Sequence, residues 1–143
     1  MKRMILLLVF VAACATSQQA SGPDVKIHLA QTNTPNDIFY FAGPVNIQYQ
    51  LSVANPTNQP LTLGRLDLET VGPGAYSLRT TATPMNLQIP ANGTSVFKIS
   101  VWGRARGGYL SATEPVTIRG TAFFRGSTGS FVKIFMENLS QMA

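Results

Sequence analysis

The sequence is poor in the residues that carry most protein chemistry. Its 143 residues include one cysteine, one histidine and six acidic side chains. A single cysteine cannot form a disulfide within the chain, so the fold must depend on packing. The paired Cys and His spacings of structural zinc sites are absent as well. No stretch approaches the roughly 20 consecutive apolar residues of a membrane-spanning helix, and the sequence predicts none.

The acidic residues are too few and too dispersed for the common active sites. Asp67 and Glu69 lie two positions apart and could offer oxygens to calcium, but calcium takes about six to eight ligands. His28 alternates with apolar residues, which places it on the solvated face of an expected strand. An enzyme would need a pocket in which His28 meets an acid and a serine. The sequence therefore predicts a protein that is not an enzyme and has no metal site and no cofactor.

Basic residues are in moderate excess. The formal net charge is +5, and loss of Lys2 and Arg3 with a cleaved leader would lower it to +3. The cations are scattered along the chain, and only Arg104 and Arg106 lie close together. Nucleic-acid binding needs a concentrated basic stripe, so we expect no nucleic-acid partner. Scattered charge is typical of a solubilising surface, with slight attraction to anionic lipid.

The first 13 residues have the layout of a secretory signal peptide. Lys2 and Arg3 precede an apolar stretch, residues 4–13, and small residues follow it. As a helix, these ten residues would span about 15 Å, roughly half of a hydrocarbon core of about 30 Å. We therefore expect a signal helix and not a permanent membrane span.

The segment Val11-Ala12-Ala13-Cys14 resembles the lipobox of bacterial lipoproteins. The resemblance implies that Cys14 becomes the first residue and that its acylated sulfur attaches the chain to a lipid bilayer. The family's inner-membrane retention signal is an aspartate at the position of Ala15, so the resemblance favours the periplasmic face of the outer membrane. In the alternative, Ala13-Cys14-Ala15 is an ordinary A-x-A site, and cleavage after Ala15 releases a soluble binding domain.

These features divide the chain into three parts. Residues 1–13 form the signal peptide, residues 14–23 hold the lipidated cysteine and a flexible tether, and residues 24–143 form one folded domain. The tether is small, polar and uncharged, which is typical of a segment that does not fold. About 120 residues are enough for one hydrophobic core and too few for two.

The folded part reads as β-strands because most of its apolar runs repeat every second residue. In the clearest run, Val45, Ile47, Tyr49, Leu51 and Val53 alternate with polar residues, as in a half-buried strand. Proline and glycine clusters separate the runs. We predict an all-β fold, a single antiparallel β-sandwich of immunoglobulin or fibronectin type with about seven to nine strands, after the signal helix and tether.

One run changes phase. Leu61 and Leu63 occupy odd positions, whereas Leu66 and Leu68 occupy even ones, with Gly64 between them. A slip of one residue would turn half of these side chains away from the core. A β-bulge at Gly64 would restore the phase, because a bulge inserts one extra residue. A bend or a strand break at the same place is the alternative.

The last two runs, residues 116–124 and 130–136, are expected to form a hairpin around a Gly-rich turn. Both faces of the second run are apolar. We expect its even positions to face the core, which leaves Phe131 and Phe135 on the other face beside Phe123. That face is then either covered by the rest of the fold or exposed as an aromatic patch for a protein partner or a lipid surface.

Two segments resemble late-embryogenesis-abundant (LEA) type 2 domains, also called water-hypersensitivity domains. Residues 51–63 contain a strand, an Asn-Pro, a polar loop and a Pro-Leu strand, and residues 89–101 contain I-P-x-x-G before an alternating strand. Many immunoglobulin-like domains share these features, including Asx-type turns, here at Asn55 and Asn92. The early turn at residues 71–74 departs from the type 2 pattern. The resemblance implies a β-sandwich and a stress or desiccation role, and it carries no ligand residues.

Taken together, the sequence predicts an envelope lipoprotein with a non-catalytic β-sandwich. Its partners would be the bilayer, through acylated Cys14, and another envelope protein. A stress-protective domain of the LEA type and a secreted soluble domain are the alternatives.

Overall fold

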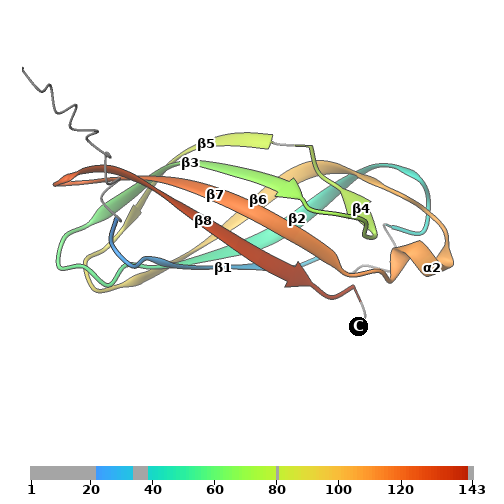
Figure 1. Cartoon of the computed structure of the whole chain (residues 1–143), viewed down its shortest axis with the longest axis horizontal. Helices are drawn as coiled ribbons and strands as arrows, with labels where there is room; N and C mark the ends of the chain where they lie inside the picture. The colour runs from blue at the N-terminus through green and yellow to red at the C-terminus, as the bar shows by residue number, and fades with distance from the viewer. Residues whose placement is uncertain (1–21, 34–38, 80, 142–143) are drawn as a thin grey trace, which may run out of the picture.

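The computed structural model describes residues 22–33, 39–79 and 81–141. They form an antiparallel two-sheet sandwich, which confirms the predicted fold class (Figure 1). One sheet has the order β1-β2-β6-β4 and the other β5-β3-β7-β8. The elements are β1 (Lys26–Gln31), β2 (Gly43–Ala54), β3 (Leu61–Thr70), β4 (Tyr76–Ser77), β5 (Thr81–Ile89), β6 (Thr94–Ala105), the helix α2 (Tyr109–Ala112), β7 (Val116–Gly126) and β8 (Gly129–Leu139).

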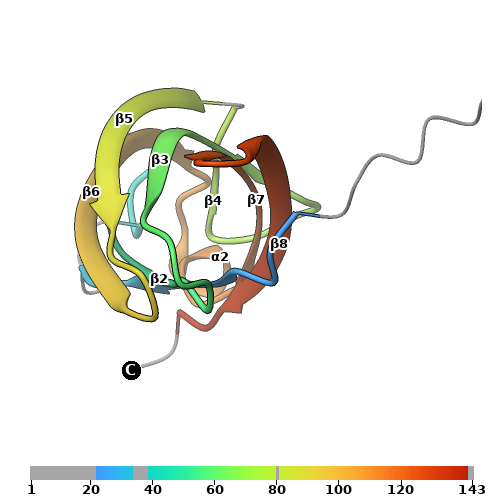
Figure 2. The same ribbon diagram turned by 90° about the vertical axis from the view of Figure 1, so that its left-hand side faces the viewer.

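The strands run along the length of the molecule, so the sandwich has two distinct ends. At the first end, Lys26 of β1 pairs with Ala54 of β2, and the β7–β8 hairpin turns there (Figure 1). At the second end, Gly43 of β2 pairs with Ala105 of β6, and α2 follows shortly after. Seen along its length, the molecule shows the two sheets curving around one core (Figure 2).

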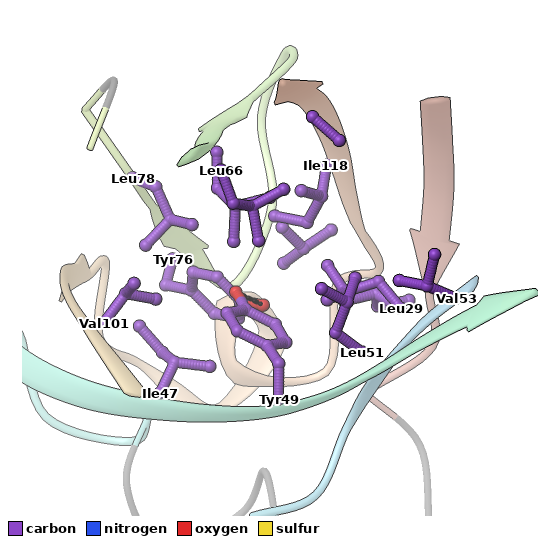
Figure 3. Close-up of a cluster of buried hydrophobic side chains, with 14 of the residues drawn as sticks. Leu29, Ile47, Tyr49, Leu51, Val53, Leu66, Tyr76, Leu78, Val101 and Ile118 are labelled. Carbon is purple, nitrogen blue, oxygen red and sulfur yellow. Dashed lines mark hydrogen bonds between the residues drawn. The ribbon is translucent and has the colours of Figure 1, made fainter. Parts of the chain in front are cut away.

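The core is built from the alternating faces that the sequence shows. The odd-numbered apolar residues of β2, from Val45 to Val53, are all buried, and Leu29, Leu66 and Ile118 pack against them from other strands (Figure 3). Full burial of a Leu or Ile side chain contributes about 1.5–3 kcal/mol relative to exposure. With no disulfide possible, this layer of side chains is what holds the two sheets together.

The β-bulge predicted at Gly64 is confirmed. β3 runs unbroken from Leu61 to Thr70, and its register against both neighbouring strands shifts between Leu63 and Arg65. The extra residue restores the phase, so the four leucines on either side of the bulge all point into the core.

The two seams between the sheets differ. Where β1 meets β8, polar side chains bridge the edges: the Nζ of Lys133 lies 3.2 Å from a carboxylate oxygen of Asp24. Glu137 accepts a hydrogen bond from the backbone N–H of Leu29 (3.3 Å) and lies 2.7 Å from Nδ1 of His28. These bridges occupy edge groups that could otherwise pair with a foreign strand. Where β5 faces β6, there is instead an open groove of about 630 Å³ lined by residues 83–87 and 96–100.

Two elements were not expected from the sequence. β4 has two residues and α2 has four, and both are too short to show a periodicity. Tyr76 of β4 is nevertheless buried in the core, where its hydroxyl lies 2.7 Å from that of Tyr49 (Figure 3). Burial raises the pKa of both hydroxyls above their ordinary value, because the buried phenolate would lose its hydration.

Candidate functional site: an apolar end of the sandwich

The predicted lipidation site lies outside the described residues. This applies to Cys14 and to the lipobox residues Val11, Ala12 and Ala13. The signal peptide, the acylation and the cleavage site therefore stay predictions. Within residues 22–33, 39–79 and 81–141, no helix is long and apolar enough to cross a membrane.

The predicted face of Phe123, Phe131 and Phe135 is wrong in its composition. Phe131 and Phe135 pack against the core from β8, and only Phe123 lies on the outer face of the sheet. The even positions, expected in the core, are the exposed ones: Val132, Ile134 and Met136 have exposed fractions of 46%, 56% and 59%.

Partners on neighbouring strands explain this reversal. Phe135 pairs with Gly120 on β7, and its ring covers the space that a Cβ at Gly120 would fill. Phe131 stacks on Phe124 with 5.1 Å between the ring centroids. Lys133 shares this face and reaches its ion partner on the segment leading into β1. The odd-numbered positions of β8 include Lys133 and Glu137. They face inward because Asp24 and His28, just before and within β1, contact these two charged side chains.

A cluster of exposed apolar side chains lies at the second end of the sandwich. Tyr40 and Phe41, before β2, are 49% and 75% exposed, and Tyr109 and Leu110 of α2 are 76% and 79% exposed. We call these four residues the apolar end. Single exposed apolar residues need no explanation, but a contiguous group of this kind is typical of an interaction site.

Contacts with the core and between neighbouring loops hold the backbone around the apolar end in place. Phe39 is fully buried and packs on Tyr76, with 4.9 Å between the ring centroids. The C=O of Tyr40 accepts a hydrogen bond from the N–H of Gly108 (2.8 Å). Gly107 has a φ of +78° and lies so close to residue 42 that a Cβ would come within 2.4 Å of the Ala42 nitrogen. Glycine is required here both for the left-handed backbone and for the close approach.

The apolar end encloses a small hollow. A pocket of about 320 Å³ is lined by Tyr40, Tyr109, Ala112 and Thr113. Its walls come from two segments far apart in the sequence, which only the fold brings together. It could accept one or two apolar side chains of a partner.

Tryptophan and arginine lie on the part of β6 that leads toward the apolar end. Trp102 is 68% exposed on the outer face of β6, and Arg104 lies two residues further along the same face. Arg106 pairs with Glu114, whereas Arg104 forms no ion pair with any described residue. Protein-binding surfaces are enriched in tyrosine, tryptophan and arginine. The sequence had shown the Arg104/Arg106 pair but not the exposed tyrosines of the apolar end.

The remaining candidate residues take part in two separate polar contacts. The His28 side chain is 70% exposed and contacts Glu137, an acid 109 positions away in sequence. Asp67 forms an ion pair with Arg65 at 2.8 Å. In the described part of the chain, no group of three or more His, Cys, Asp or Glu side chains could hold a metal ion.

Comparisons with known proteins give a fold and no family. No family model matches the chain, and no curated protein matches it. Among solved structures, an X-ray structure of a structural-genomics target is similar with a TM-score of 0.53 and 14% identity, over 81% of this chain and 84% of that one. The yeast GGA1 GAE domain is similar with a TM-score of 0.51 and 13% identity, over 84% and 96% of the two chains.

The structure of a LEA protein in solution also matches, with a TM-score of 0.42 and 11% identity over 79% of this chain and 68% of that one. At such identities the likeness concerns the β-sandwich fold alone. The stress-protective role implied by the sequence resemblance stays a prediction.

Proposed function

We propose that this protein is a lipid-anchored module of a bacterial envelope that binds a partner protein through its apolar end and catalyses no reaction. The observation that carries the proposal is the separation of the two ends. The chain enters the fold beside the first end, where Lys26 pairs with Ala54. The apolar end lies at the other end of β2, whose 12 residues span about 40 Å at the rise of a β-strand.

This separation has a mechanical consequence. Acylated Cys14 would hold one end of the sandwich, while the tyrosines and Leu110 would be carried about 40 Å from that point. A rigid sandwich keeps the distance between its two ends fixed, so a partner at the apolar end would bind far from the anchored end. Burying exposed aromatic groups against a partner is the usual source of affinity in such contacts.

The anchor is tested by the intact mass of the chain extracted from bacterial membranes. We expect acyl mass on a chain that begins at Cys14, and none in a Cys14→Ala variant. A chain that begins at residue 16 without acyl mass would contradict the lipoprotein and support the secreted alternative.

Partner binding at the apolar end is tested by photocrosslinking in intact cells. A photoreactive phenylalanine analogue at position 109 should give an adduct of discrete mass, and the same analogue at the exposed position 48, midway along β2, should give none. Adding the substitution Leu110→Ser to the variant labelled at position 109 should abolish the adduct. Equal crosslinking from positions 109 and 48 would contradict binding at the apolar end.

A further inference from the structure

We infer that the outer face of the β7–β8 hairpin rests on the bilayer that holds the acylated cysteine. This inference depends on the proposed lipid anchor and adds an orientation to it. The contact surface is the stripe formed by Val132, Ile134 and Met136, which we call the β8 stripe. Its three side chains are between 46% and 59% exposed although they lie in the interior of the 11-residue strand β8.

The point where the chain enters the fold places the stripe within reach of the bilayer. Gly22 lies against the ring of Phe131, because a Cβ at Gly22 would come within 2.5 Å of that ring. Asp24 is bridged to Lys133. The first described residues therefore lie beside the start of β8. Eight peptide steps join Cys14 to Gly22 and span at most about 29 Å, while the stripe is about 13 Å long.

The charges around the stripe fit anionic headgroups. The outward side chains of β7 are Thr117, Arg119, Thr121, Phe123 and Arg125, and those of β8 are Ser130, Val132, Ile134, Met136 and Asn138. No acid occurs among them. Arg125 forms no ion pair with any described residue, and Arg119 has only a long contact of 3.9 Å with Glu69. Apolar groups flanked by cations are typical of surfaces that lie in the membrane interface.

The outer face of β2, in the other sheet, is mostly polar and supplies a control. Gln48 and Gln50 of β2 are exposed there, and no apolar stripe runs along that strand. A domain that rests on β8 holds this face away from the lipid. The two faces should therefore differ in their contact with the bilayer.

The experiment uses the full chain with one added cysteine. Acylation consumes the thiol of Cys14, so Ile134→Cys or Gln48→Cys provides the one free thiol for an environment-sensitive fluorophore. Each labelled protein is reconstituted into vesicles of phosphatidylethanolamine and phosphatidylglycerol, with and without spin-labelled lipid as quencher. We expect blue-shifted, strongly quenched emission from position 134 and water-like, unquenched emission from position 48.

Each other outcome would contradict either the orientation on the bilayer or the lipid anchor. Equal quenching at both positions, or none at position 134, would overturn the orientation while the acyl mass still supports the anchor. A blue shift at position 134 without lipid, in a protein that is dimeric in detergent, would assign the stripe to a second copy and would also overturn it. If the chain carries no acyl group, the anchor fails. The labelled chain is then added to an excess of phosphatidylglycerol vesicles, where selective quenching at position 134 supports the lipid-binding face and its absence refutes it.

Discussion

The hydroxyl groups of Tyr49 and Tyr76 lie 2.7 Å apart inside the core, where the two side chains meet between the sheets. The Tyr76 hydroxyl donates to Oε1 of Gln31 (2.9 Å), and the side chain of Gln31 pairs with that of the buried Gln141. This short chain of hydrogen bonds joins β1, β2, β4 and the segment after β8. A buried polar network of this kind is stabilising only while each group keeps its partner.

The tyrosine pair predicts a loss of stability at alkaline pH. Burial raises the pKa of both hydroxyls in the folded state above the ordinary value of 10. Below pH 10 both states are protonated and stability is intact. Above pH 10 the unfolded chain loses protons that the folded chain keeps, so the free energy of unfolding falls by up to about 1.4 kcal/mol per pH unit for each tyrosine.

Urea denaturation at pH values from 8 to 11 measures this slope. The Tyr49→Phe, Tyr76→Phe double variant should show a shallower decline, because it removes both titrating groups. An unchanged slope in the double variant would mean that other groups cause the alkaline loss.

Gly107 is predicted to hold the apolar end in shape. Gly107→Ala would place a methyl group 2.4 Å from the Ala42 nitrogen and would also strain a φ of +78°. Gly72 is a matched control, since its φ is +76° and nothing lies within 4 Å of its Cβ position. We expect Gly72→Ala to cost about 1–3 kcal/mol from backbone strain alone. Gly107→Ala should cost clearly more and should also abolish crosslinking from position 109. Equal losses in the two variants would argue against the close contact.

Asn55 is predicted to be the most sensitive turn residue. It is buried, its Nδ2 donates to the carbonyls of Gln59 (2.8 Å) and Pro90 (3.1 Å), and its Oδ1 accepts from the N–H and the hydroxyl of Thr57. Asn55→Ala should lower the free energy of unfolding by about 2–4 kcal/mol, because it removes four hydrogen bonds that hold the turn after β2 against the turn after β5. The exposed Asn58→Ala variant should change it by less than about 0.5 kcal/mol. Thermal and urea unfolding of both variants test this difference.

The inward position of Phe131 and Phe135 on β8 can be tested by truncating side chains on both faces of the strand. Phe131→Ala and Phe135→Ala should each cost about 2–4 kcal/mol, since both rings pack against the core. Ile134→Ala should change stability by no more than about 0.5 kcal/mol, because its side chain is exposed. The opposite order in urea denaturation would restore the arrangement expected from the sequence.

Much of the architecture could be read from local patterns. The alternation in β2 predicted a half-buried strand, and the phase change between Leu63 and Leu66 predicted the bulge at Gly64. Asn55-Pro56-Thr57 predicted an Asx turn, and the N–H of Thr57 does donate to Oδ1 of Asn55. At Asn92 the backbone is left-handed, with a φ of +51°. These features are local, since each depends on neighbours within a few residues.

The sequence by itself determined a two-residue alternation and the positions of the turns, because strand pleating and turn geometry act over short distances. Only the tertiary structure decided which face of β8 points inward, since Gly120 and Asp24 had to arrive from other segments to accept Phe135 and Lys133. The same holds for the apolar end, whose pocket joins Tyr40 to Tyr109 across 69 positions of sequence. Contacts of that range depend on how the sheets pack, and no local pattern of side chains encodes them.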